Sequence, residues 1–148
     1  MTRPLRLLLV TSHWPPPGPV VKRSAESLQA AGLNVEVFAF HALGLYSYVA
    51  AWIRLRPRLH PGRYDVVHTQ AANAVLTLLH RVPLVITVSN LELGARLAAR
   101  RADAVVVPSE EIGRHLHTRA PVHVLPPGLD DTTQAARLID VYRTVTNA

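Results

Sequence analysis

Six short apolar runs alternate with stretches of helical periodicity, and this alternation restricts the fold of the chain more than any other feature. The runs cover residues 5–10, 35–40, 65–68, 84–88, 104–107 and 122–125. Parallel strands need long crossover connections, which helices usually supply. The pattern therefore predicts an α/β domain in which a parallel sheet lies between two layers of helices.

We expect a single Rossmann-like, three-layer domain in residues 1–130, with six parallel strands in the order 3-2-1-4-5-6, numbered along the chain. Residues 131–148 continue it with one last helix. Apolar side chains recur there at helical spacing, at Ala135, Leu138, Ile139, Tyr142 and Val145. This stripe predicts that the last helix packs back on the domain.

Composition excludes several classes of protein. No apolar run reaches the roughly 18 residues of a membrane span, and the start lacks the organisation of a signal peptide, so we expect a cytoplasmic protein. The chain has no cysteine and a net charge of +6, and only Lys22 of its 16 basic residues is a lysine. Such a charge favours a polyanionic partner, although a general bias towards arginine accounts for it equally well.

Ligands of open parallel sheets bind beyond the carboxyl ends of the strands, where the strand order reverses. For the expected order this point lies between the first and fourth strands. The candidate ligand-binding residues near it are His13, Gly18, Lys22, Arg23, His68, Gln70, Ser89, Asn90 and Ser109. Simpler structural roles compete for four of them: His13 as a loop histidine that caps a backbone carbonyl, His68 as a structural residue at the end of its strand, and Ser89 with Asn90 as a turn and helix cap.

The motifs of several cofactor sites are missing. The first loop has only Gly18 and lacks the G-x-G-x-x-G pattern, and no P-loop motif occurs. His115 and His117 are two apart on a predicted helix, so they point to different faces. We therefore expect no cofactor and no metal ion, and we do not expect nucleic acid as a partner.

The segment 45–58 allows two interpretations. Leu45, Tyr48, Val49, Trp52 and Ile53 form an apolar stripe beside several arginines. The stripe could lie on an anionic lipid surface, which would make the protein peripheral to a membrane. A helix packed on the core, with a solvated basic end, explains the same residues, and we favour this interpretation.

Several segments resemble the retaining glycosyltransferases of family 4. The similarity begins with the strand at 7–11, which is followed by a proline-rich loop. It continues in the same order as in the family through 31–37 (AGLNVEV), 64–70 (YDVVHTQ), 82–88 (VPLVITV), 101–110 (RADAVVVPSE) and 122–130 (VHVLPPGLD).

The resemblance implies the N-terminal, acceptor-binding domain of a GT-B enzyme, followed by a helix similar to the family's C-terminal crossover helix. The nucleotide-sugar domain of the family would then be missing, and its E-x7-E motif does not occur here. The resemblance therefore implies a chain that holds no catalytic residue and is inactive alone. We expect it to bind an acceptor, and it could dimerise through the cleft face, where Trp14 and Leu91 lie. The alternatives are an engineered or excised scaffold without a ligand, and a basic module that binds lipid surfaces or nucleic acid.

Overall fold

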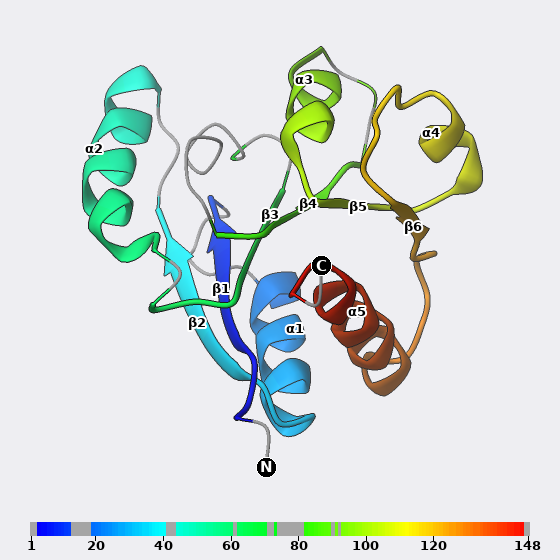
Figure 1. The fold of residues 1–148 in the computed structure, drawn as a ribbon, viewed down its shortest axis with the longest axis horizontal. Helices are drawn as coiled ribbons and strands as arrows, with labels where there is room; N and C mark the ends of the chain where they lie inside the picture. Colours follow the sequence, from blue (N-terminus) through cyan, green and yellow to red (C-terminus); the bar gives the residue numbers. More distant parts are fainter. Residues whose placement is uncertain are drawn as a thin grey trace.

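The computed structural model describes residues 3–12, 19–40, 44–60, 62–70, 73, 82–89, 91 and 93–146. Strands and helices alternate along them (Figure 1). Their bounds are β1 (Arg6–Thr11), α1 (Pro19–Ala30), β2 (Asn34–Ala39), α2 (Leu45–Leu55), η1 (Arg56–Arg58), β3 (Val66–Gln70), β4 (Leu84–Thr87), α3 (Leu93–Arg101), β5 (Ala104–Val107), α4 (Glu110–Arg114), β6 (Val122–Val124) and α5 (Asp131–Thr146). The helix expected at 71–80 lies outside the described residues, apart from Asn73.

The six expected strands form one sheet in which every neighbouring pair is parallel. This confirms the predicted Rossmann-like α/β class. The order, however, is β2-β1-β3-β4-β5-β6, so the expected position of the third strand outside the second is wrong. Instead β3 pairs with β1 and β4, and Leu8 lies opposite Val67 in the register.

Burial explains this position of β3. Val66 and Val67 are both buried, so β3 is covered on both faces, as a central strand of a parallel sheet must be. In β2, by contrast, Asn34 and Glu36 are exposed and alternate with buried side chains. That alternation suits an edge strand. The strand order therefore reverses between β1 and β3, whereas the expected reversal lay between the first and fourth strands.

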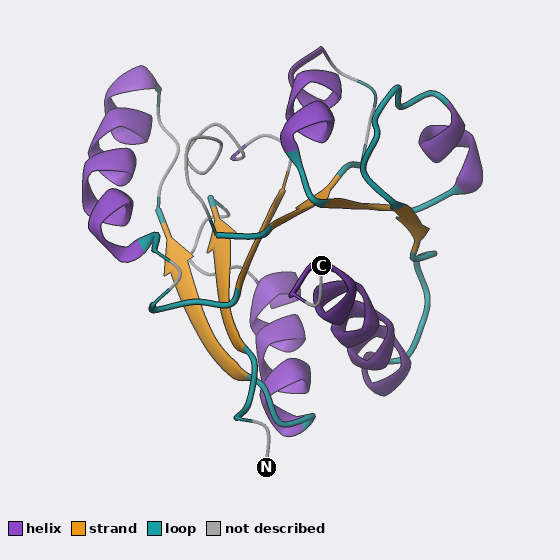
Figure 2. Cartoon of the chain, in the orientation of Figure 1, coloured by secondary structure: helices purple, strands orange, loops and turns teal. Residues whose placement is uncertain are grey.

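Helices cover both faces of the sheet, as Figure 2 shows. The helices α1 and α5 lie on one face, where they enclose a core with Leu7, Leu9, Val85 and Val106. The helices α2, α3 and α4 lie on the other face, whose core contains Leu8 and other strand residues. Alternate residues of each strand thus serve opposite cores.

The helix boundaries have local causes. After α1, Gly32 has a φ of 102°, a conformation that favours glycine. The N–H of Leu33 then donates to the carbonyl of Leu28, which closes the helix end. Ser109 precedes α4, and its side chain accepts a hydrogen bond from the N–H of Ile112, which makes Ser109 the N-cap of that helix.

The last helix packs as its apolar stripe predicts. The side chains buried along α5 are Ala135, Leu138, Ile139, Val141, Tyr142 and Val145. They belong to the same core cluster as α1 and the sheet. Arg23 of α1 forms an ion pair with Asp131 at the start of α5, with 3.2 Å between the charged groups.

Two aspartates join neighbouring strands at the amino edge of the sheet. The Asp65 carboxylate accepts a hydrogen bond from the backbone N–H of Arg6, and its own N–H donates to the carbonyl of Arg6. Asp103 does the same with Leu84, at 2.8 Å in both directions. Each aspartate thus helps to set the register between the strand that it precedes and the strand beside it.

Asp65 also binds the guanidinium groups of Arg3 and Arg6 at 2.9 and 3.1 Å. Partial burial acts to raise the pKa of Asp65, but the hydrogen bonds and charge of Arg6 and Arg3 outweigh it and lower the pKa to about 2. The ionised carboxylate therefore stabilises the folded state.

We predict that Asp65→Asn removes part of the acid sensitivity of the fold. The pKa of Asp65 falls from 3.8 to about 2 on folding, so its contribution is present above pH 3.8 and is lost as the pH falls towards 2. The loss corresponds to about 2 kcal/mol of unfolding free energy. Urea unfolding at a series of pH values should give a shallower acid slope for the variant, and equal slopes would contradict the prediction.

Candidate functional site

A cavity of about 200 Å³ lies between the sheet and the helices α1 and α5, near the carboxyl ends of the strands. It adjoins β1 and β3, between which the strand order reverses, and extends towards β4 and β5. Its described lining consists of Leu9, Val10, Val21, Ser24, Leu28, His68, Thr69, Gln70, Thr87, Ser89, Val106, Val107, Pro108, Leu125, Gln134, Leu138 and Tyr142. This is the position at which open parallel sheets bind ligands.

Three polar side chains form a hydrogen-bonded chain in the wall of the cavity. The Nδ1 atom of His68 lies 2.6 Å from the Tyr142 hydroxyl, and its Nε2 atom lies 2.6 Å from Oγ1 of Thr87. The chain joins β3, β4 and α5. A neutral imidazole donates through one nitrogen and accepts through the other, so both ring nitrogens are satisfied.

Burial keeps this chain uncharged. Tyr142 is fully buried, and burial raises the pKa of its hydroxyl far above the usual range. Burial also lowers the pKa of His68 to about 4. His68 retains some exposed surface because it faces the cavity. At neutral pH the chain can therefore donate and accept hydrogen bonds but carries no charge.

The rest of the lining indicates the kind of ligand that the cavity accepts. None of the described lining residues is Asp, Glu, Lys or Arg. Hydroxyl and amide groups come from Ser24, Gln70, Ser89 and Gln134, while most other lining side chains are apolar. Pockets for drug-sized ligands measure roughly 300–1,000 Å³, so this cavity suits a small, neutral, hydroxylated molecule.

The structure brings together some of the predicted site residues. His68, Gln70 and Ser89 all line the cavity, whereas His13, Gly18 and Asn90 lie outside the described residues, as do Trp14 and the prolines that follow it.

The remaining three predicted residues are not part of the described lining. Lys22 is exposed on α1, Arg23 pairs with Asp131, and Ser109 caps α4. Across the described ranges no group of three or more potential ligands could hold a metal ion, and no helix is long and apolar enough to cross a membrane.

Sequence reasoning missed Thr87 and Tyr142 as partners of His68. Tyr142 was expected only as part of the apolar stripe. A buried tyrosine hydroxyl nearly always finds a hydrogen-bond partner, so its place in that stripe implied a polar group opposite. Thr87 is two residues after Val85 and therefore shares its face of the sheet. Neither observation identifies the partner, because His68 and Tyr142 are 74 residues apart.

We predict that His68→Gln weakens the pH dependence of stability between pH 6.5 and 4. Unfolded His68 takes up a proton near pH 6.5, whereas the folded group does so only near pH 4. The free energy of unfolding is therefore highest above pH 6.5, where His68 is neutral in both states. It falls by about 3 kcal/mol as the pH is lowered from 6.5 to 4.

Chemical unfolding across that range measures the slope for the parent and the variant. Glutamine keeps a donor and an acceptor but does not titrate. We therefore expect the variant to be less stable than the parent at neutral pH, and its stability to fall less steeply towards pH 4. An unchanged slope would show that folding does not lower the pKa of His68, and would contradict the prediction.

Comparisons with known proteins agree with this geometry. The structure resembles that of a sucrose-phosphate synthase from Thermosynechococcus elongatus, with a TM-score of 0.75 over 94% of this chain and 98% of that chain. The sequence identity is 15%, so this likeness shows the fold alone. A search of curated proteins gave no match. The profile described as Glycosyltransferase Family 4 matches residues 33–133, which is more than half of the sequence, and the chain therefore belongs to glycosyltransferase family 4.

Proposed function

We propose that these 148 residues form the acceptor-binding side of a glycosyltransferase, with the acceptor in the cavity at the carboxyl edge of the sheet. The observation that carries the proposal is the neutral, hydrogen-bonding cavity at the reversal of strand order, in a chain that belongs to a glycosyltransferase family. The sheet supplies one side of the cavity, and α5 (Asp131–Thr146) closes it. Part of the cavity wall thus comes from Gln134, Leu138 and Tyr142.

The acceptor is a small polyol or a single sugar unit. A sugar presents hydroxyl groups around an apolar ring, and the cavity combines hydroxyl and amide groups with apolar walls in the same way. A phosphate or carboxylate group on the ligand would find no cationic side chain among the described lining residues. Burying such a charge without a partner is costly.

The uncharged lining is also unsuited to the sugar donor. Transfer from a nucleotide sugar needs groups that stabilise the charge on the departing diphosphate. The described cavity lining offers no lysine or arginine for this purpose, and its two titratable groups, His68 and Tyr142, are neutral. We therefore propose that these residues alone do not transfer sugar.

A direct assay tests the absence of transfer. The 148-residue chain is incubated with UDP-, GDP- or ADP-linked sugars and a panel of monosaccharide and polyol acceptors, and release of nucleoside diphosphate is measured. We expect none above the rate without protein. Release that depends on both the chain and an acceptor would refute the proposal.

Binding of the acceptor is tested separately, by saturation-transfer NMR with monosaccharides and glycerol. Ser24 faces the cavity from α1, so Ser24→Leu should fill it and abolish the ligand signals. Ser27 lies on the same helix outside the lining and bonds to the carbonyl of Arg23. Ser27→Leu is the matched control and should preserve binding. Equal signals from both variants would place the ligand outside the cavity.

A further inference from the structure

The helix α2 has an apolar face that remains exposed in the part of the chain that the structure describes. Among the described residues, the large apolar side chains that remain exposed are Leu45, Tyr46, Val49, Ile53, Leu97, Val122 and Val124. The first four all belong to α2. Leu45 and Tyr46 are 81% and 86% exposed, and Ile53 is 60% exposed. Leu45, Val49 and Ile53 recur at every fourth position, so they form one continuous stripe.

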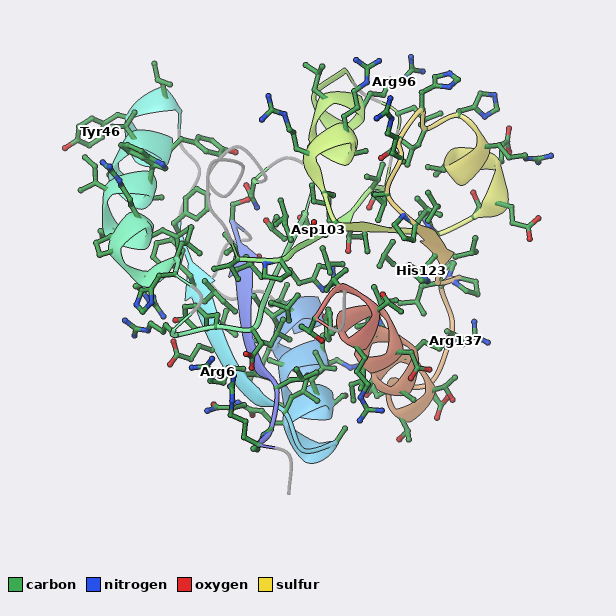
Figure 3. The ribbon with its side chains drawn as sticks, viewed as in Figure 1. Arg6, Tyr46, Arg96, Asp103, His123 and Arg137 are labelled. Atoms are coloured by element: carbon green, nitrogen blue, oxygen red, sulfur yellow. The ribbon has the colours of Figure 1, made fainter. Side chains whose placement is uncertain are left out.

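The opposite face of α2 is the one that packs on the sheet. Ala51 and Leu55 are fully buried there, and Tyr48 and Trp52 pack against the same core. The helix thus has two apolar faces, which is unusual for a surface helix with one side in water. Figure 1 shows α2 at one end of the molecule, and Figure 3 shows Tyr46 pointing away from the body of the protein. The interpretation of this segment as wholly core-packed is therefore incomplete.

Positive charge lies at the C-terminal end of the exposed stripe. Residues 37–64 contain four arginines and no aspartate or glutamate. Arg58 and Arg63 share Glu36, at 2.9 and 3.9 Å. Arg54 and Arg56 form no ion pair with any described residue and lie instead over the rings of Phe38 and Trp52, at 5.6 and 5.1 Å from the ring centroids.

This charge distinguishes between the surfaces that could cover the stripe. A second copy of the same face would bring two positively charged segments together, and like charges oppose such contact. An anionic bilayer accepts both features together, because its acyl region takes up apolar side chains and its headgroups attract arginine. The net charge of +6 attracts the whole chain to such a surface.

We propose that α2 is a membrane-surface anchor that lies flat on an anionic phospholipid bilayer. Leu45, Tyr46, Val49 and Ile53 enter the boundary between headgroups and acyl chains, and Arg54 and Arg56 contact the phosphate groups. The helix binds the surface and does not span the bilayer, because its 11 residues are about half the length that a span needs.

Vesicle flotation tests the anchor. The protein is mixed with phosphatidylcholine vesicles, with or without about one-third phosphatidylglycerol, a content at which headgroup charge attracts basic segments. We expect flotation only with the anionic vesicles, and weaker flotation at high salt. Binding to neither vesicle type, or equally to both, would overturn the proposal.

Paired variants locate the contact. Ile53→Ser should weaken partitioning about tenfold, the effect of moving one such side chain from lipid to water. Leu97→Ser, at a site 52% exposed on α3, is the matched control and should leave binding unchanged. Because both positions are exposed, the two variants should melt at the same temperature as the parent.

The charges are tested in the same way. Arg54→Gln combined with Arg56→Gln should lower binding to anionic vesicles roughly tenfold. The control changes Arg137 and Arg143, which are exposed on α5 at the other face of the sheet, to glutamine, and should retain binding.

Two outcomes reject the anchor. The first is equal loss in the α2 variants and their controls. The second is a vesicle-independent dimer that Ile53→Ser dissociates, which would assign the stripe to a second copy of this chain.

Discussion

A parallel sheet must be covered on both faces, and on one face of this protein much of the cover comes from the last helix. Six side chains of α5 are buried against the sheet and α1. At roughly 1.5–3 kcal/mol for each large side chain, this burial contributes on the order of 10 kcal/mol, which is comparable to the whole stability of a typical domain. Leu9, Val85 and Val106 would otherwise face water.

The cavity depends on the same helix. Gln134, Leu138 and Tyr142 form one wall, and the sheet forms the opposite wall. The Tyr142 hydroxyl has to satisfy a hydrogen bond in a buried position, and His68 supplies the partner. Leaving such a group unpaired costs about 1–3 kcal/mol. The polar chain through Thr87 therefore helps to determine where α5 crosses the sheet, and that position determines the shape of the site.

The two faces of the sheet are covered in different ways. On the α1 and α5 face, helix side chains are buried against strands and against each other. On the other face, α2 buries Ala51 and Leu55 but leaves Leu45 and Ile53 in water. Periodicity alone did not separate these two groups, because apolar residues follow both faces of this short helix. Their separation depends on which side of α2 meets the sheet.

The sequence by itself determined the elements and much of their packing. The six apolar runs and the stripe on α5 each act within one element, so local pattern was enough to predict them. The alternation of Asn34 and Glu36 with apolar neighbours even marked β2 as an edge strand, although the predicted strand order did not use it. Of the predicted site residues in the described part, His68, Gln70 and Ser89 line the cavity, because carboxyl ends of parallel strands meet at one edge.

Only the tertiary structure decided which of these residues meet. The order of β1, β3 and β4 depends on the direction of each crossover, which the apolar runs do not encode. The contacts of His68 with Thr87 and Tyr142 join three elements, and both the lowered pKa of His68 and the neutral cavity follow from those contacts and their burial. Likewise, the exposed stripe of α2 exists because packing against the sheet uses only one of its two apolar faces.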